Sequence, residues 1–257
     1  MHKEKDGDVH TDIQNGIATI VFHHPASNSL PGVLLNKLAD AIEHAGSDKK
    51  VRVIVLKSEG EKAFCAGASF DELMSISNME EGEKFFSGFA RVINNMRKAP
   101  VFVICRVQGK TVGGGVGLAA AADYCFAMDT ASIKLSELSV GIGPFVVGPA
   151  VERKLGLSAM SQLSINATAW QSAQWAQQKG LYNDVFSNME ELDAAVDALS
   201  RKLAESNPEA MAKLKQVFWL GTESWDALLA ERAATSGELV LSDFTREAIS
   251  AFRQGAR

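Results

Sequence analysis

The chain has 257 residues, of which 46% are hydrophobic and 22% are charged. These shares are close to those of soluble globular proteins, so they exclude a disordered chain, a collagen-like fibre and a coiled coil. The net charge of −5 argues against non-specific nucleic-acid binding, because that kind of binding depends on neutralising phosphates.

The N-terminal segment MHKEKDGDVH is polar and charged, so we expect no signal peptide there. The longest weakly apolar stretch, residues 111–122, is far shorter than the ~20 residues that a membrane-spanning helix needs. Cys65, Cys105 and Cys125 are too few for a disulfide framework, and their odd number favours a reducing compartment. We therefore expect a soluble, cytoplasmic protein without a membrane partner.

The first half of the chain alternates predicted strands and helices. Asn15-Gly16 between two short apolar runs predicts a β-hairpin. Apolar residues at helical spacing predict helices near 34–45 and 80–98, and Ser69-Phe70-Asp71-Glu72 has the spacing of a capping box. Apolar runs at 51–56, 101–107 and 124–128 predict strands. Together these elements predict an α/β layer structure.

The last quarter of the chain predicts helices only, at residues 192–206, 208–220 and 225–252. Pro208 after Asn207 suits the first turn of a new helix. We therefore divide the chain into an α/β core, residues 1–191, and a helical C-terminal segment, residues 192–257. This segment is expected to serve in oligomerisation or as a lid, or else to complete the core.

Two glycine-containing loops each follow a predicted strand and precede a predicted helix. The first is Ala63-Phe64-Cys65-Ala66-Gly67-Ala68, and the second is Gly113-Gly114-Gly115. The first N–H groups of a helix lack internal partners and carry partial positive charge. Two such loops side by side would form an oxyanion hole, in which each donor stabilises a developing negative charge by ~3 kcal/mol. The alternatives are an ordinary tight turn and close packing of a helix on the sheet.

Glu137 lies among small and apolar residues in Leu135-Ser136-Glu137-Leu138-Ser139-Val140. A carboxylate in such surroundings has a raised pKa and can exchange protons near neutral pH. The alternative is a surface glutamate at the end of a strand.

Other candidate residues favour structural roles. His23 and His24 could bind a metal, but adjacent strand residues point to opposite faces. Cys65 could be a nucleophile at a helix start, but no histidine partner is identifiable, so we expect a packed thiol. Asp123 follows an apolar helix and is expected to cap or pin a turn.

Five blocks in this order make the sequence recognisable. They are residues 17–30, AFCAGASFDEL, PVFVICRVQGKTVGGGVGLAAAADYCFA, SELSVGIGP and AQWAQQKGL. The chain resembles the enoyl-CoA hydratase/isomerase (crotonase) superfamily over nearly its whole length. The resemblance implies a crotonase-like spiral of ββα units, with a helical C-terminal segment that forms homotrimers, often paired as hexamers.

The resemblance also implies an acyl-CoA thioester as the substrate, in fatty acid metabolism, with no metal and no redox cofactor. The backbone N–H groups of Ala68 and Gly114 match the superfamily's oxyanion hole. Ala66, Ser69 and Phe70 fall in the block that lines the coenzyme A and acyl groups. Position 69 is usually acidic in the superfamily and is serine here.

One departure concerns the reaction. Typical hydratases of the superfamily carry two catalytic glutamates, and the matching positions here are Gly117 and Glu137. One glutamate favours isomerisation, in which Glu137 removes a proton from C2 of a 3-enoyl thioester and returns it at C4. Hydration of a 2-enoyl thioester with a single glutamate is the alternative, and a non-catalytic acyl-CoA binder is a third reading. The missing side chain at Gly117 also predicts an enlarged acyl pocket.

A dinucleotide-dependent oxidoreductase is a further alternative. Gly115-x-Gly117-x-x-Ala120 matches a loose dinucleotide fingerprint, which should follow its strand at once. Residues 108–112 intervene between the strand and this motif, which argues against the alternative.

Overall fold

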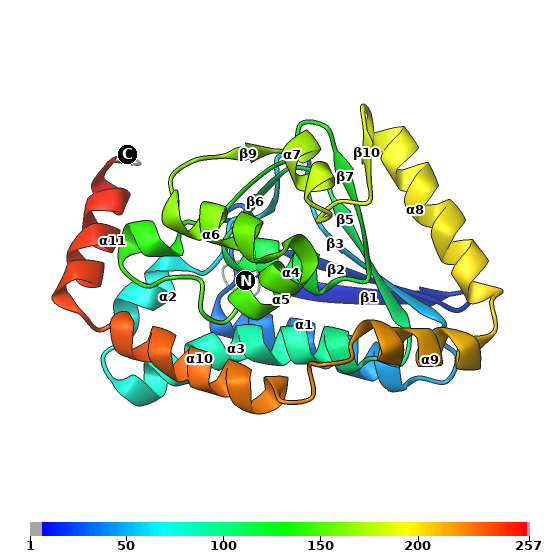
Figure 1. Ribbon diagram of the computed structural model, residues 1–257, viewed down its shortest axis with the longest axis horizontal. Coiled ribbons are helices and arrows are strands. Elements are labelled where there is room, and N and C mark those ends of the chain that lie inside the picture. The colour runs from blue at the N-terminus through cyan, green and yellow to red at the C-terminus, as the bar shows by residue number, and fades with distance from the viewer. Residues whose placement is uncertain (1–6, 256–257) are drawn as a thin grey trace.

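The computed structural model describes residues 7–255 (Figure 1). Residues 1–6 and 256–257 lie outside the described part. The prediction that residues 1–10 form no signal peptide therefore falls mostly outside the described residues. Within residues 7–255, no helix combines the length and the apolar character needed to cross a membrane.

A six-stranded sheet forms the centre of the molecule, in the order β1-β2-β3-β5-β7-β10. β1 and β2 form the predicted antiparallel hairpin, with Asn15 and Gly16 both at positive φ in the turn. The other neighbouring strands are parallel. The strands are β1 (Asp8–Gln14), β2 (Ile17–His23), β3 (Val53–Ser58), β5 (Phe102–Val107), β7 (Tyr124–Met128) and β10 (Asp184–Phe186).

A second, four-stranded sheet consists of very short strands in the order β4-β6-β8-β9. β4, β6 and β8 run parallel, and β9 is antiparallel to β8. Strands this short carry no readable alternation of apolar residues, so the sequence did not predict this sheet. Its strands are β4 (Ala63–Cys65), β6 (Lys110–Val112), β8 (Ser132–Lys134) and β9 (Gln171–Ser172).

The chain repeats one unit three times: a strand of the large sheet, a strand of the small sheet, then a helical segment. The three units are β3-β4-α2, β5-β6-α4 and β7-β8-η1. The α/β fold class is thus confirmed. The helices of residues 7–165 are α1 (Gly32–Ser47), α2 (Phe70–Ser75), α3 (Met79–Lys98), α4 (Gly114–Ala121), the 3₁₀ helix η1 (Glu137–Val140), α5 (Gly148–Leu155) and α6 (Leu157–Ile165).

The C-terminal part contains α7 (Ala173–Gln178), α8 (Met189–Ala204), α9 (Pro208–Phe218), α10 (Trp225–Leu239) and α11 (Asp243–Gly255). The prediction of one helix over residues 225–252 was wrong. The Oγ of Ser242 accepts a hydrogen bond from the Thr245 N–H at 3.2 Å, so the chain turns after α10 and starts a new helix. α11 then lies beside α2, at the opposite end of the molecule from α8 (Figure 1).

The C-terminal helices pack on the α/β core. α8 covers one face of the large sheet, where Leu192 and Val196 join Val53, Val55 and Ile104 in an apolar cluster. The expected boundary between residues 191 and 192 falls inside the first turn of α8. A role of residues 192–257 in trimerisation stays a prediction.

A buried ion pair fixes α9 to the core. Lys215 Nζ lies 2.9 Å from Asp123 Oδ2 and donates to the Met96 and Val101 carbonyls, both at 2.8 Å. Asp123 also accepts hydrogen bonds from the Val103 N–H at the start of β5 and from the Trp219 indole. Asp123 therefore does more than pin a turn, because it joins α9 to β5.

Candidate active site

The repeated unit brings the three candidate segments together. β4, β6 and β8 are parallel neighbours, so their carboxyl ends meet at one edge of the small sheet. The chain leaves this edge at residues 66–69, at Gly113 and at residues 135–136. The two glycine loops and the segment that carries Glu137 are therefore adjacent.

Close contacts join these segments. The Gly113 N–H donates to the Lys134 carbonyl at 2.9 Å. A Cβ placed on Gly67 would lie 3.0 Å from the Val112 carbonyl oxygen and 3.7 Å from the Gly114 nitrogen. A Cβ placed on Gly113 would lie 2.7 Å from Glu137 Oε1. Gly67 and Gly113 also have φ values of +87° and +51°, which L side chains rarely adopt.

Two backbone donors at this edge have no acceptor in the described part of the chain. Leu30 pairs with the residues on either side of Ala68, through Leu30 N–H to Gly67 O and Ser69 N–H to Leu30 O. No acceptor for the Ala68 N–H or the Gly114 N–H is found within residues 7–255. Gly114 is the first residue of α4, where an N–H has no partner inside the helix. Both groups thus remain available to a ligand oxygen.

Buried amides hold the first loop in place. Asn28 Nδ2 and Gln108 Nε2 each donate to the Ala63 carbonyl at 3.0 Å, and the Ala66 N–H donates to Ser27 O at 3.1 Å. Sequence reasoning missed these residues. The one available signal was Asn28 itself, because asparagine tolerates the left-handed conformation that it adopts here, with φ +57°.

Glu137 is the first residue of η1. Burial of its carboxyl group raises the pKa to about 7. Its Oε2 is shielded from solvent and has no hydrogen-bond partner in the described part of the chain. A surface glutamate at a strand end would be solvated, so that alternative is wrong. The group can change its protonation state near neutral pH, as a proton-transfer catalyst must.

The place of a second carboxylate is filled. A Cβ on Gly117 would lie 2.5 Å from Val147 Cγ1 and 2.7 Å from Val147 Cβ. Val147, directly before α5, is 4% exposed. The expectation that Gly117 enlarges the acyl pocket was therefore wrong at this point, because a valine side chain occupies the space.

Ser69 and Phe70 begin α2. The Ser69 Oγ accepts the Glu72 N–H at 3.4 Å, as the N-cap prediction required. The capping box is incomplete, however, because the Glu72 carboxylate accepts the Gly32 N–H at 2.6 Å instead. Glu72 thus joins α2 to α1. Phe70 is partly buried against the main core.

Cys65 packs against both glycine loops. Its thiol is fully buried, and burial raises its pKa to about 12. The Sγ accepts the Gly67 N–H at 3.4 Å, and a Cβ on Gly115 would lie 2.6 Å from the Cys65 Cβ. The prediction of a packed thiol is confirmed, since a thiol with this pKa is no nucleophile at neutral pH.

The two adjacent histidines have different partners. His23 Nδ1 is 3.5 Å from Glu59 Oε2, whereas His24 Nδ1 is 2.9 Å from Ser29 Oγ. In the described residues, no group of three or more His, Cys, Asp or Glu side chains is placed to hold a metal ion.

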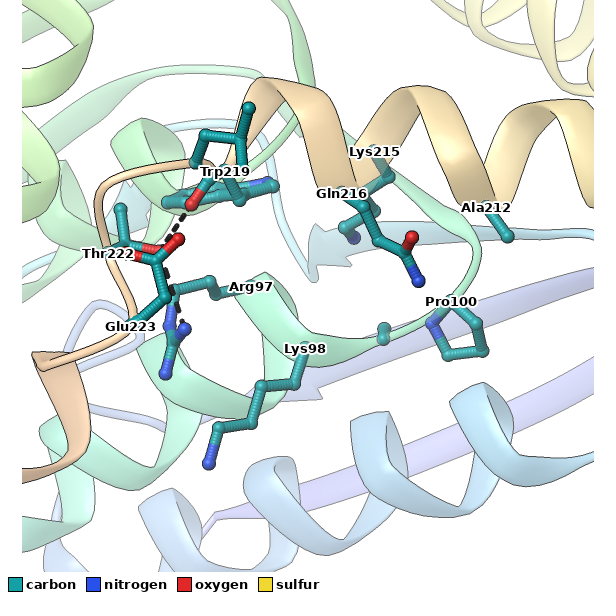
Figure 2. Close-up of a pocket in the computed structure, with 11 residues that line it drawn as sticks. Arg97, Lys98, Pro100, Ala212, Lys215, Gln216, Trp219, Thr222 and Glu223 are labelled. Atoms are coloured by element: carbon teal, nitrogen blue, oxygen red, sulfur yellow. Dashed lines mark hydrogen bonds between the residues drawn. The ribbon is translucent and has the colours of Figure 1, made fainter.

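A pocket of about 310 Å³ lies elsewhere, between the end of α3 and α9, and contains none of the predicted site residues. Figure 2 shows Arg97, Lys98 and Lys215 along it. Each of these cations has an acidic partner: Asp226 for Arg97 and Lys98, and Asp123 for Lys215. The pocket therefore belongs to the packing interface between α9 and the core.

The chain is similar in sequence to proteins of one known family. Residues 12–252 match the family described as enoyl-CoA hydratase/isomerase. The chain is 34% identical over 200 residues to human mitochondrial methylglutaconyl-CoA hydratase, covering 76% of this chain and 58% of that protein. It is 27% identical to a probable enoyl-CoA hydratase of Bacillus subtilis, with 92% of each chain covered.

Solved structures share the fold. The crystal structure of an enoyl-CoA hydratase from Bacillus halodurans superposes with a TM-score of 0.87 at 21% identity, over 95% of this chain and 99% of the other. A second, from Mycobacterium avium subsp. paratuberculosis K-10, gives a TM-score of 0.83 at 24% identity, with 96% of each chain covered.

Proposed function

Since this chain belongs to the enoyl-CoA hydratase/isomerase family, we propose that it converts 3-enoyl-CoA thioesters to 2-enoyl-CoA thioesters. The observation that carries this proposal is the buried carboxylate of Glu137, which has no second carboxylate at position 117 beside it. Glu137 has a pKa of about 7, and Val147 fills the space of a second acidic side chain at Gly117. Isomerisation needs one group that takes and returns one proton, and Glu137 suffices for that.

In the proposed reaction, the thioester oxygen accepts hydrogen bonds from the Ala68 and Gly114 N–H groups. The ionised Glu137 removes a proton from C2, and the C–H electron pair moves into a dienolate whose oxygen carries the negative charge. The protonated Glu137 then delivers the same proton to C4, and the double bond forms between C2 and C3. The two backbone donors lower the barrier because they strengthen as charge develops on the oxygen.

We further propose that Ala66, Ser69 and Phe70 contact the coenzyme A and acyl groups. Both ends of the reaction are at the same oxidation level and the proton is conserved, so the step as written needs no metal and no redox cofactor. A homotrimer or hexamer formed through residues 192–257 remains part of this proposal.

Hydration of a 2-enoyl thioester is the second candidate, favoured by the names of the relatives, which are called hydratases. In this reaction Glu137 alone would activate water for addition at C3. Glycine at position 117, in place of a second carboxylate, argues against it, because two acidic groups hold and activate water better than one.

Absorbance separates these candidates, since only the conjugated 2-enoyl thioester absorbs strongly. Rising absorbance with a 3-enoyl-CoA, abolished in Glu137→Gln, is the expected result. Falling absorbance with a 2-enoyl-CoA and no reaction of the 3-enoyl-CoA would replace the proposal with hydration. Tight binding without turnover of either thioester would indicate a non-catalytic acyl-CoA binder.

A further inference from the structure

We propose that Val147 determines the reaction specificity of this site, by keeping a second carboxylate and its water away from Glu137. This inference rests on the proposed function, since it explains why the site works with one carboxylate. Val147 does not itself transfer a proton. It acts as a wall.

The position of the wall follows from α4. Gly113 contacts Glu137, since a Cβ on Gly113 would lie 2.7 Å from Glu137 Oε1. Gly117 lies one helical turn further along, and its N–H donates to the Gly113 carbonyl at 3.3 Å. Glu137 and Val147 therefore lie against two glycines that are one helical turn apart at the start of α4.

The wall leaves no room at position 117. A Cβ there would lie 2.5 Å from Val147 Cγ1 and 2.7 Å from its Cβ, but 3.6 Å from its Cα. Both of the shorter distances are far below van der Waals contact, whereas 3.6 Å is ordinary contact. Replacing Val147 with alanine thus leaves a clash, and only glycine at position 147 makes room for a side chain at position 117.

The Glu137 carboxyl group and Val147 are also both shielded from solvent, at Oε2 in the case of Glu137. Val147 is buried, and Glu137 Oε2 has neither solvent contact nor a hydrogen-bond partner among the described residues. An isopropyl group offers no hydrogen bond to a water molecule, and an ordered buried water needs two or more polar partners. The position of a residue-117 side chain, one helical turn from the glycine that Glu137 contacts, is therefore apolar and filled.

The test combines substitutions at positions 117 and 147. Gly117→Glu alone is expected to destabilise the protein and to give no hydration. The double variant Gly117→Glu/Val147→Ala is expected to show the same two effects, because the clash with the residue-147 Cβ remains. Gly117→Glu with Val147→Gly is expected to fold and to hydrate a 2-enoyl-CoA at least about tenfold faster than Val147→Gly alone, a change of about 1.4 kcal/mol in the barrier. Val146, also 4% exposed, supplies the matched control, because Gly117→Glu with Val146→Gly keeps the clash.

The proposal would be overturned if the Gly117→Glu variant folded and hydrated a 2-enoyl-CoA as fast as the Gly117→Glu/Val147→Gly variant. So would a folded, acyl-CoA-binding Gly117→Glu/Val147→Gly variant whose hydration is no faster than that of Val147→Gly.

Val147→Gly alone covers the case in which the double variant does not fold. Its ratio of hydration to isomerisation is expected to rise about tenfold above that of Val146→Gly, because water gains access beside Glu137. Equal ratios in these two variants would contradict the inference. The wild-type protein, assayed with both thioesters in the same experiment, tests the proposed function separately. If the wild type does not isomerise the 3-enoyl-CoA, the proposed function is wrong, whatever ratio the two valine variants show.

Discussion

At the scale of single residues, the site depends on a carboxyl group that the fold keeps out of water. Burial disfavours the charged form of Glu137 and raises its pKa from an ordinary 4.5 to about 7. A base with this pKa is half ionised at neutral pH and still strong enough to remove a proton next to a thioester.

Replacing Glu137 with glutamine should lower kcat for the 3-enoyl thioester by about 10²–10⁴-fold, the usual contribution of a general acid–base group. The wild-type kcat/KM should fall below a pKa near 7, because only the ionised carboxylate takes the C2 proton. Stopped-flow absorbance between pH 5 and pH 9 measures both effects. A wild-type profile that stays flat through pH 7 would remove Glu137 from the role of base.

The same burial affects stability. Between pH 4.5 and pH 7 the folded state holds a proton on Glu137 that the unfolded state has lost, so the free energy of unfolding falls as pH rises through this window. The full loss is on the order of 3 kcal/mol above pH 7. Glu137→Gln should therefore be more stable than the wild type at pH 8 and similar to it at pH 4.5. Urea unfolding at the two pH values checks this, and equal differences at both would contradict it.

At the scale of elements, three short strands do most to build the site. β4, β6 and β8 each end at the same edge of the small sheet, and each is followed by one of the proposed site residues Ala68, Gly114 and Glu137. The glycines at these ends allow the loops to approach within contact distance, which a Cβ would prevent.

Gly67→Ala tests this role, with Gly60→Ala as its control. Both glycines have φ above +80°, so both substitutions carry a similar backbone penalty of about 1–2 kcal/mol. The space around Gly60 is open within 4 Å, whereas a Cβ on Gly67 meets the Val112 carbonyl at 3.0 Å. Activity should fall at least tenfold in Gly67→Ala only. Steady-state kinetics of both variants, together with their melting temperatures, decide the matter, and equal activities would show that the loop contact is unimportant.

Much of this architecture could be predicted from the sequence, and the exceptions have physical causes. The strand predicted at 51–56 was clear because its run is rich in β-branched residues, and the helix at 80–98 was clear because its apolar pattern is long. Three-residue strands carry no such pattern, so the small sheet was missed. Glu137 and the two glycine loops were found from their neighbours, but Val147 could not be, because its contact with Gly117 joins segments thirty residues apart.

At the scale of the whole molecule, the C-terminal helices complete the core. α8 covers one face of the large sheet, and α9 is tied to β5 through Lys215 and Asp123. In Figure 1, α9 and α10 run along the helices of the first half of the chain.

Lys215→Met should destabilise the protein by about 3–5 kcal/mol, because it leaves the Asp123 carboxylate buried without its partner. Lys98→Met provides the control, because Lys98 is half exposed in its pair with Asp226 and should cost less than about 1 kcal/mol. Adding Asp123→Asn to Lys215→Met should recover part of the loss. Chemical denaturation measures all three, and a small effect of Lys215→Met would mean that α9 contributes little to stability.

In the proposed reaction Glu137, shielded from water, carries one proton from C2 to C4. The most direct measurement uses a 3-enoyl-CoA in which both hydrogens on C2 are deuterium. The isomerisation is run in ordinary water, and the product is analysed by NMR. Transfer of one proton by Glu137 should place deuterium at C4 of the 2-enoyl product. Only protium at C4, or no 2-enoyl product at all, would contradict it.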